Sequence, residues 1–471
     1  MTQTITQSSH QESSLPSWVI WVQCSAFVVL YAVWILPEIV GFRNTALATG
    51  AIFGAYSIYQ YRKALLQKSA LPIWLMIALF GWATFHLFFL SSNFPLQYIE
   101  YFRIWKYAAI GAVMATGLGL SLIHSSKQES VRYWFLIYFG LCTPCIIYLV
   151  KYVLTMVGRV YGLDIPVSMQ VYSFSQPFYV PKTDYVAFCL PAFSVALGSL
   201  IRLSDIEGSW RLKDLLNLVA QILIISGTLF LFAAQNIKNG MVYAALLFII
   251  FGMIFCARHI SRLTWKKIAG ILIAFAILIS GIIVNVSKND SWRTLVTDTK
   301  IGLQIEKYPN WKDEIKYNFP LNENGAMVSA TNYQRAAWAY AGIKLAIENP
   351  MGYGLVEDSF AKLAKVRWPD VGSSLSHSHS GWLDVILAIG FPGFFLILGA
   401  LLLAIKNSYL LRGGYESLLV FWPLLANLLL WCTTEVSATV TFAALIFWIC
   451  LAGGLNAGTS MKTASPKLVA E

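Results

Sequence analysis

The chain has 471 residues, of which 57% are hydrophobic, 15% are aromatic and only 12% are charged. Because soluble domains carry about 25% charged residues, this composition excludes an ordinary soluble protein and predicts one that crosses a membrane many times. The formal net charge of +11 does not indicate nucleic-acid binding, because the basic residues lie in short loops between apolar segments, as the positive-inside rule requires.

Apolar segments near the roughly 20 residues that a membrane helix needs recur along the chain after a polar amino-terminal tail. About twelve are present, over residues 18–36, 44–60, 71–90, 104–123, 131–157, 183–201, 214–233, 239–257, 268–286, 381–405, 416–432 and 436–456. Basic residues concentrate in alternate loops, which places the amino terminus in the cytoplasm. The short loops on the outer side carry fewer cations, namely Arg43, Arg103, Arg159, Lys182 and Lys238.

These segments predict an all-α polytopic membrane protein with about 12 transmembrane helices. The predicted parts are a cytoplasmic tail over 1–17, transmembrane helices 1–9 over 18–286, a loop domain over 287–380, transmembrane helices 10–12 over 381–456, and a second cytoplasmic tail over 457–471. The loop domain falls between helices 9 and 10 on the outer side of the membrane. Its nearly balanced charges and scattered aromatic residues indicate a small, mainly helical domain that is ordered in water.

One helix of the loop domain can be placed from its ends. Thr331-Asn-Tyr-Gln334 has the spacing of a capping box, which predicts a helix from there to about Glu348. Pro350 restricts the residue before it and stops the helix. Three- and four-residue spacing puts one set of mostly small residues on a common face, so we expect this face to approach the membrane part closely. The set is Arg335, Trp338, Ala339, Gly342 and Ala346.

Two histidines, His377 and His379, lie where the loop domain runs into the next apolar segment. Ser380 is a suitable N-cap for a helix that begins near Gly381. The positive end of the helix dipole would then disfavour a charged His379, and a neutral imidazole can accept a proton from a hydroxyl. Two roles are open for Asp384: it orients the imidazole, or it only caps charge at the interface. The alternative for His379 is an interfacial polar residue without a special role.

Metal binding and several other chemistries are not indicated. His377 and His379 are two residues apart, but no third ligand stands at a recognisable distance. The chain has no phosphate-binding G-x-x-x-x-G-K-[S/T] loop and no H-E-x-x-H or G-x-S-x-G motif. Cations on the outer rim could instead hold a pyrophosphate. Arg335 is the first candidate and Lys238 the second, although each alone is more often an ordinary surface charge.

The order of these features resembles the O-antigen ligase and polymerase superfamily. The motifs that carry the resemblance are Gln334-Arg-Ala-Ala-Trp338, Glu348-Asn-Pro-Met-Gly-Tyr-Gly354, His377-Ser-His-Ser380 and Gly390-Phe-Pro-Gly393. The resemblance implies an inverting glycosyltransferase of the bacterial inner membrane, with an active site that faces the periplasm and needs neither metal nor cofactor. It also implies membrane lipids as surroundings, an undecaprenyl-pyrophosphate-linked glycan as donor, a hydroxyl acceptor such as lipid A-core, and no nucleic acid.

The family's functional residues fall on this chain only in part. The motif histidine, usually followed by asparagine, falls on His379 with Ser380 after it, and the loop arginine falls on Arg335. A further arginine is replaced near Lys238, so Lys238, Arg293 or Arg159 is expected to take its place. The resemblance therefore implies His379 and Arg335 as catalytic residues and Lys238, Arg335, Arg293, Arg159 and His377 as substrate-binding residues.

The resemblance leaves the acceptor open. An O-antigen ligase that modifies lipid A-core, a polysaccharide polymerase and a protein O-oligosaccharyltransferase belong to the same superfamily. A transporter or flippase is an alternative of a different class, since about twelve spans would suit it as well.

Overall fold

A computed structural model describes residues 15–171, 179–206, 209–259, 290–323, 325–410, 414–433 and 438–464 of the chain. This part is helical, and its one β feature is an isolated bridge between Leu321 and Met327. The prediction of an all-α protein is therefore confirmed for the described residues.

The first half of the chain forms a series of long helices. They are α1 (Ser17–Val33), α2 (Val40–Gln60), α3 (Leu71–Phe89), α4 (Phe94–Glu100), α5 (Lys106–His124), α6 (Lys127–Tyr161), α7 (Lys182–Ser204), α8 (Leu212–Ala234) and α9 (Lys238–His259). Helix α4 continues into α5 through a π-helical turn over Tyr101–Trp105. Short 3₁₀ turns lie at Arg62–Leu66, Lys68–Ala70 and Val167–Met169.

The second half holds the loop domain and three further long helices. The loop domain contains α11 (Asp290–Arg293), α12 (Leu295–Gly302), a 3₁₀ turn at Pro309–Lys312, α13 (Ala330–Glu348) and α14 (Ser359–Arg367). After it come α15 (Gly381–Leu410), α16 (Tyr415–Leu430), a π-helical turn at Ala438–Phe442 and α17 (Ala443–Ala464).

In the described part of the chain, eight helices are long and apolar enough to cross a membrane. The predicted count of about twelve is not confirmed, for three reasons. Helix α1 and the apolar part of α16 are shorter than the others, and α2 is not among the eight. The predicted span over residues 268–286 lies outside the described residues. The molecule is a multi-pass membrane protein with α17 at its centre, since every residue of the most apolar stretch of α17 is buried.

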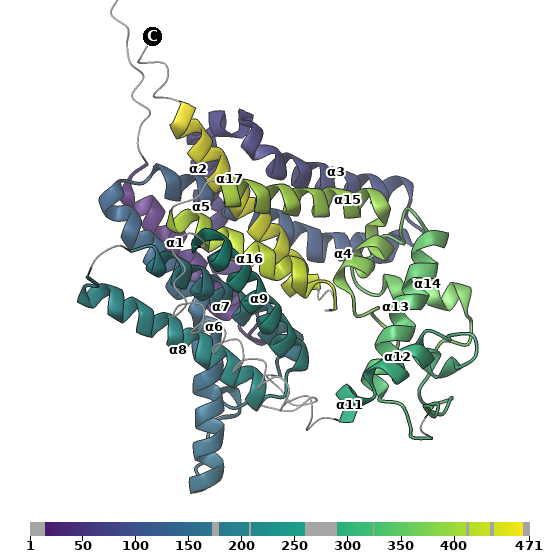
Figure 1. Ribbon diagram of the computed structural model, residues 1–471. Coiled ribbons are helices and arrows are strands. Elements are labelled where there is room, and N and C mark those ends of the chain that lie inside the picture. The colour runs from purple at the N-terminus through teal and green to yellow at the C-terminus, as the bar shows by residue number, and fades with distance from the viewer. Residues whose placement is uncertain are drawn as a thin grey trace, which may run out of the picture.

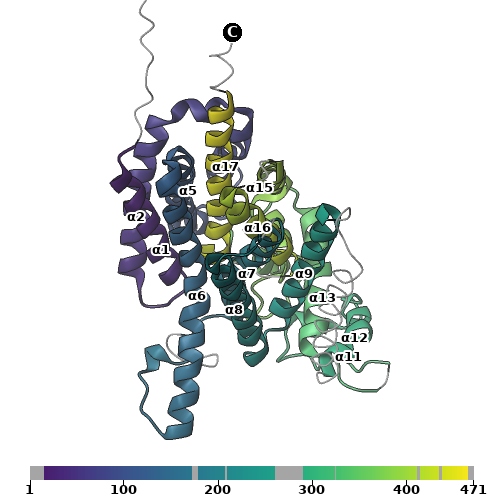
Figure 2. The same cartoon turned by 60° about the vertical axis from the view of Figure 1, so that its left-hand side comes forward.

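The two ends of the helix bundle differ. At one end, Leu15, Tyr61, Ala70, Leu120 and Ala457 form a buried apolar cluster, which joins the start of α1 to the ends of α2, α5 and α17. The loop domain occupies the opposite end, and both ribbon views separate it from the end of α17 (Figures 1 and 2). The apolar cluster and the loop domain thus mark the two ends of the bundle.

The loop domain has its own apolar core, which extends into the start of α15. Trp311, Tyr333 and Phe360 are fully buried in it, and Leu383 and Leu387 of α15 belong to the same cluster. The capping-box prediction for α13 was wrong. The helix begins at Ala330 with Ser329 as N-cap, whose side chain makes no capping hydrogen bond. The carboxylate of Asp298 instead accepts the N–H of Ser329 and the side-chain N–H of Asn332.

Helix α15 is broken at Ile389 and Gly390, where φ is 69° and ψ is −179° at the glycine. The segment Pro350–Gly354 fills the break. Tyr353 and Gly354 donate their N–H groups to the carbonyls of Leu387 and Ala388 at 2.8 and 2.7 Å, and the Phe391 N–H reaches the Pro350 carbonyl at 2.9 Å. The backbone groups that the broken helix leaves unpaired are thus bonded to the loop domain.

Candidate functional site

His379 lies in a tight turn directly before α15. Its φ of 58° is in the left-handed region, which costs a residue other than glycine about 1 kcal/mol or more. Contacts on either side hold the turn. The Ser378 N–H and hydroxyl both donate to Asp384 Oδ1, at 2.9 and 2.6 Å, and the Ser380 carbonyl accepts the Asp384 N–H at 2.8 Å. The helix starts where the sequence predicted, and backbone strain of this kind is typical of functional sites.

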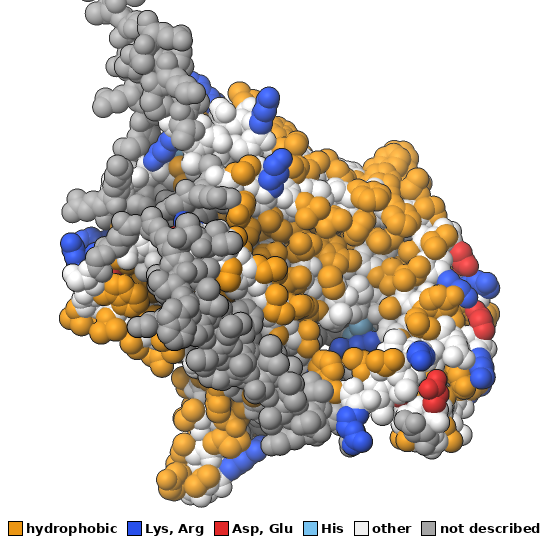
Figure 3. Space-filling view, in the orientation of Figure 1, with side chains coloured by type: hydrophobic (Ala, Val, Ile, Leu, Met, Phe, Trp, Pro, Cys, Tyr) orange, Lys and Arg blue, Asp and Glu red, His pale blue; other side chains and the backbone are white. Residues whose placement is uncertain are grey.

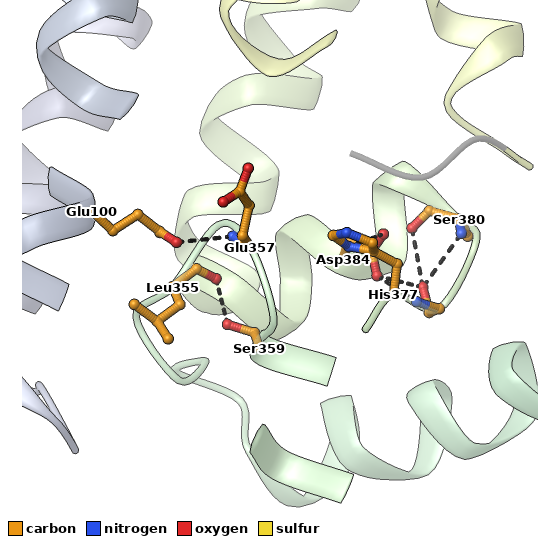
Figure 4. Close-up of polar contacts among 8 residues, drawn as sticks. Glu100, Leu355, Glu357, Ser359, His377, Ser380 and Asp384 are labelled. Carbon is orange, nitrogen blue, oxygen red and sulfur yellow. Dashed lines mark hydrogen bonds and ion pairs between the residues drawn. The ribbon is translucent and has the colours of Figure 1, made fainter. Parts of the chain in front are cut away.

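Asp384 has a different partner from the one considered for it. Its Oδ1 binds Ser378, and its Oδ2 lies 4.0 Å from Nδ1 of His377. Figure 4 shows His377 directed at Asp384, with Ser380 on the other side of the turn. Asp384 therefore fixes the backbone of the turn that carries His379, and it faces His377.

The imidazole of His379 is placed by α13. It stacks on the indole of Trp338, with ring centroids 4.9 Å apart and an interplanar angle of 18°. The Trp338 Nε1–H donates to the Trp311 carbonyl at 2.9 Å, so the indole is itself fixed. An ideal Cβ on Gly342 would lie 2.6 Å from the Leu383 side chain. The predicted small face of α13 does approach the membrane part closely, and only glycine permits this distance.

His379 is neutral over a wide pH range. Its pKa is lowered from 6.5 to about 4, chiefly by burial and in addition by the positive charge of Arg335 and by the neighbouring His377. The sequence analysis predicts a neutral imidazole because of the helix dipole. In the structure the first cause is burial and the second is Arg335, which the sequence could not place beside it.

Three cations lie near one another, and one of them, Arg335, lies near His379. Arg335 of α13 acts electrostatically on His379, and Lys238 at the start of α9 feels the charges of both Arg335 and Lys182. Arg335 and Lys238 are half-buried, and Lys182, at the start of α7, is exposed. Figure 3 shows a hollow between the broad apolar surface and the end where charges of both signs gather, with Lys or Arg and His side chains visible in it. Lys182 was not predicted as a site residue, because nothing in its local sequence pattern indicates that α7 and α9 start side by side.

The remaining candidates lie elsewhere or are differently engaged. Arg293 is exposed on α11 at the edge of the loop domain. Arg159 is exposed in the last turn of α6, at an end that protrudes away from α13 in both ribbon views (Figures 1 and 2). Arg103 forms an ion pair with Glu357. Among the described residues, no three His, Cys, Asp or Glu side chains are grouped as a metal site would need.

A second set of polar contacts, which the sequence did not predict, anchors the loop domain to α3 and α4. The buried carboxylate of Glu100 accepts the N–H groups of Val356 and Glu357. Figure 4 shows the contact with Glu357. His86 Nε2 lies 3.1 Å from the Met351 carbonyl, and its Nδ1 lies 3.0 Å from Nε2 of Gln97. Because a carbonyl only accepts, Nε2 of His86 carries the proton. An acidic residue within an apolar segment, as Glu100 is, was the signal that could have identified this contact.

Comparison with known proteins gives one finding about the family. Residues 221–398 match the family model described as O-Antigen ligase. The matched stretch runs from α8 through the loop domain into α15, so it contains Lys238, Arg335 and His379. None of the curated proteins matches the chain.

Proposed function

We propose, because residues 221–398 match the family model described as O-Antigen ligase, that the protein is an inverting, metal-independent transferase of lipid-linked glycans. The donor is a glycan on undecaprenyl pyrophosphate, and the first choice of acceptor is a hydroxyl of lipid A-core. The reaction takes place on the periplasmic face of a bacterial inner membrane. The observation that carries this proposal is the neutral imidazole of His379, stacked on Trp338 and acted on by the charge of Arg335.

In the proposed reaction, the acceptor hydroxyl loses its proton to the neutral His379. The acceptor oxygen forms a bond to the anomeric carbon from the face opposite the leaving group, so the configuration inverts. The bond between that carbon and the pyrophosphate oxygen breaks, and its electron pair stays on undecaprenyl pyrophosphate. Arg335 and Lys238 offset the negative charge that grows on the leaving group, and Lys182 adds to the same field.

The low pKa of His379 has a role in this sequence of events. In the free protein a pKa of about 4 makes the imidazole a weak base. In the free protein the positive charge of Arg335 lowers the pKa of His379. A bound pyrophosphate would bring negative charge to Arg335 and offset this effect. The pKa of His379 then rises when the donor binds, towards the working pH at which a general base is most effective. Donor binding would thus prepare the base for the acceptor.

Transfer by the purified protein tests the class of function. With a lipid-linked donor, lipid A-core and a chelator in one reaction, we expect a glycan-modified acceptor. Flux of the lipid-linked glycan across vesicles without any transfer would contradict the proposal and favour a transporter or flippase.

Deletion followed by gel analysis of surface polysaccharide separates the acceptors. Lipopolysaccharide core without its polymer indicates a ligase, as proposed. Loss of all but a single-repeat species indicates a polysaccharide polymerase, and an unchanged polysaccharide pattern with unmodified protein indicates a protein O-oligosaccharyltransferase.

A further inference from the structure

A cavity of about 210 Å³ lies between α1, α2, α5 and α17. Its walls are mainly apolar and include Leu30, Trp34, Leu47, Gly111 and Ala443. Arg43 is the one charged residue among those that line it in the described part of the chain. Nothing in the proposed reaction uses this cavity.

The cavity lies at the loop-domain end of the bundle. Leu30 and Trp34 are at the end of α1, while Leu47 and Gly111 lie within the first two turns of α2 and α5. The opposite ends of α2 and α5 meet α17 at the apolar cluster around Tyr61 and Leu120. The cavity is therefore in the half of the bundle nearest the loop domain, and Arg43 is at the level where the helices end.

Water is a poor occupant for this cavity. Apolar cavities tend to stay dry, because a water molecule needs several polar partners, and an empty cavity loses the dispersion contacts of its walls. Helix α2, which forms one wall, presents Phe42 and Ile52 outward with 69% and 67% of their surface exposed. In a membrane protein such a surface faces lipid, so hydrocarbon chains surround this helix.

Arg43 supplies a cation at the mouth of the cavity. Its Nη1–H donates to the Trp34 carbonyl at 3.0 Å, which fixes the side chain against the end of α1. A guanidinium has five N–H donors, and Arg43 has no ion pair with an acidic side chain of the described residues. Its planar fork is well suited to phosphate oxygens.

We propose that this cavity holds a hydrocarbon chain of a phosphate-bearing membrane lipid, with the lipid phosphate bound by Arg43. The site is separate from the cleft at His379, because α1, α2, α5 and α17 carry none of its cations. The proposal does not depend on the transferase activity. A bulk anionic phospholipid and a polyprenyl phosphate share the required chemistry, and the experiment distinguishes them.

Two glycines give a matched pair of variants. An ideal Cβ on Gly111 lies 3.9 Å from its nearest neighbours, the Leu47 and Phe447 side chains, so the helix itself accepts a side chain there. In Gly111→Leu the added side chain would fill the cavity. Gly81 on α3 has nothing within 4 Å of an added Cβ, so Gly81→Leu is the control. Arg43→Gln removes the cation and leaves the cavity open.

The full-length protein and its variants are purified in mild detergent, and bound lipid is measured by native mass spectrometry. Thermal stability is then followed against added phosphatidylglycerol, polyprenyl phosphate and diacylglycerol, the last of which lacks a phosphate. We expect the wild type and Gly81→Leu to be stabilised by at least one phosphate-bearing lipid and not by diacylglycerol. The lipid that stabilises the protein shows whether the site binds a bulk anionic phospholipid or a polyprenyl phosphate.

Gly111→Leu and Arg43→Gln should each bind that lipid at least tenfold more weakly. The proposal is wrong if both variants retain the lipid as the wild type does, or if diacylglycerol stabilises as well as the phosphate-bearing lipids. Should Gly111→Leu fail to fold, the comparison of Arg43→Gln with the wild type decides the question alone.

Discussion

The pH dependence of transfer follows from the surroundings of His379. Its pKa of about 4 in the free protein keeps the imidazole about 97% neutral at pH 5.5, whereas an ordinary histidine with a pKa near 6.5 would be about 9% neutral there. Because kcat/KM reports the pKa of the free enzyme, we expect kcat/KM to stay nearly constant between pH 7.5 and 5.5. An unperturbed histidine would cause a loss of about tenfold.

The variant Arg335→Gln tests the cause of this low pKa. Loss of the guanidinium removes one of the charges that lower the His379 pKa, while burial remains, so the acid limb of the normalised kcat/KM profile should move to higher pH. Lys344→Gln on the same helix is the control, since Lys344 pairs with Glu306 at 2.9 Å. Stopped assays over pH 4 to 8 measure both profiles. A wild-type limb near pH 6.5 that Arg335→Gln leaves in place would refute the reasoning.

Two further predictions concern the anchoring of the loop domain. Gly390→Ala puts a Cβ 2.5 Å from the Pro350 carbonyl oxygen, at a backbone conformation open only to glycine. We therefore expect the free energy of unfolding to fall by about 2 kcal/mol or more. Gly399→Ala on the same helix is the control, because an added Cβ has room there, and it should have the melting temperature of the wild type. Glu100→Ala leaves the buried N–H of Val356 and the part-buried N–H of Glu357 without their acceptor, at a cost of about 2 kcal/mol. Hydrogen exchange at Val356 and Glu357 should then rise by about thirtyfold, and unchanged exchange would show that the carboxylate does not hold this segment.

Several parts of this fold follow from local patterns in the sequence. Apolar runs indicate the long helices, and the charges of the loops indicate how their ends alternate. The helix of Arg335 and Trp338 was expected within one residue of its true start, although the capping box that led to this prediction does not form. The start of α15, with His379 two residues before it, could be located from Ser380 and the polar residues that precede it.

Contacts between distant segments could not be predicted in this way. The break of α15 at Gly390 depends on hydrogen bonds with residues some forty positions earlier in the chain, at Pro350 and Gly354. The approach of Lys182 to Lys238 depends on how α7 packs beside α9. The pKa of His379 depends on burial, which no single sequence states. Each of these needs the tertiary arrangement, so the sequence indicated His379, Arg335 and Lys238 as candidates but neither Lys182 nor the contacts that these residues make.

The central claim is that His379 is the general base of glycan transfer. The most direct test is the rate at which purified His379→Ala transfers glycan from a lipid-linked donor, measured together with its affinity for that donor. We expect His379→Ala to lose transfer while it still binds the donor, because Arg335 and Lys238 remain in place. Transfer by His379→Ala at the wild-type rate would contradict it.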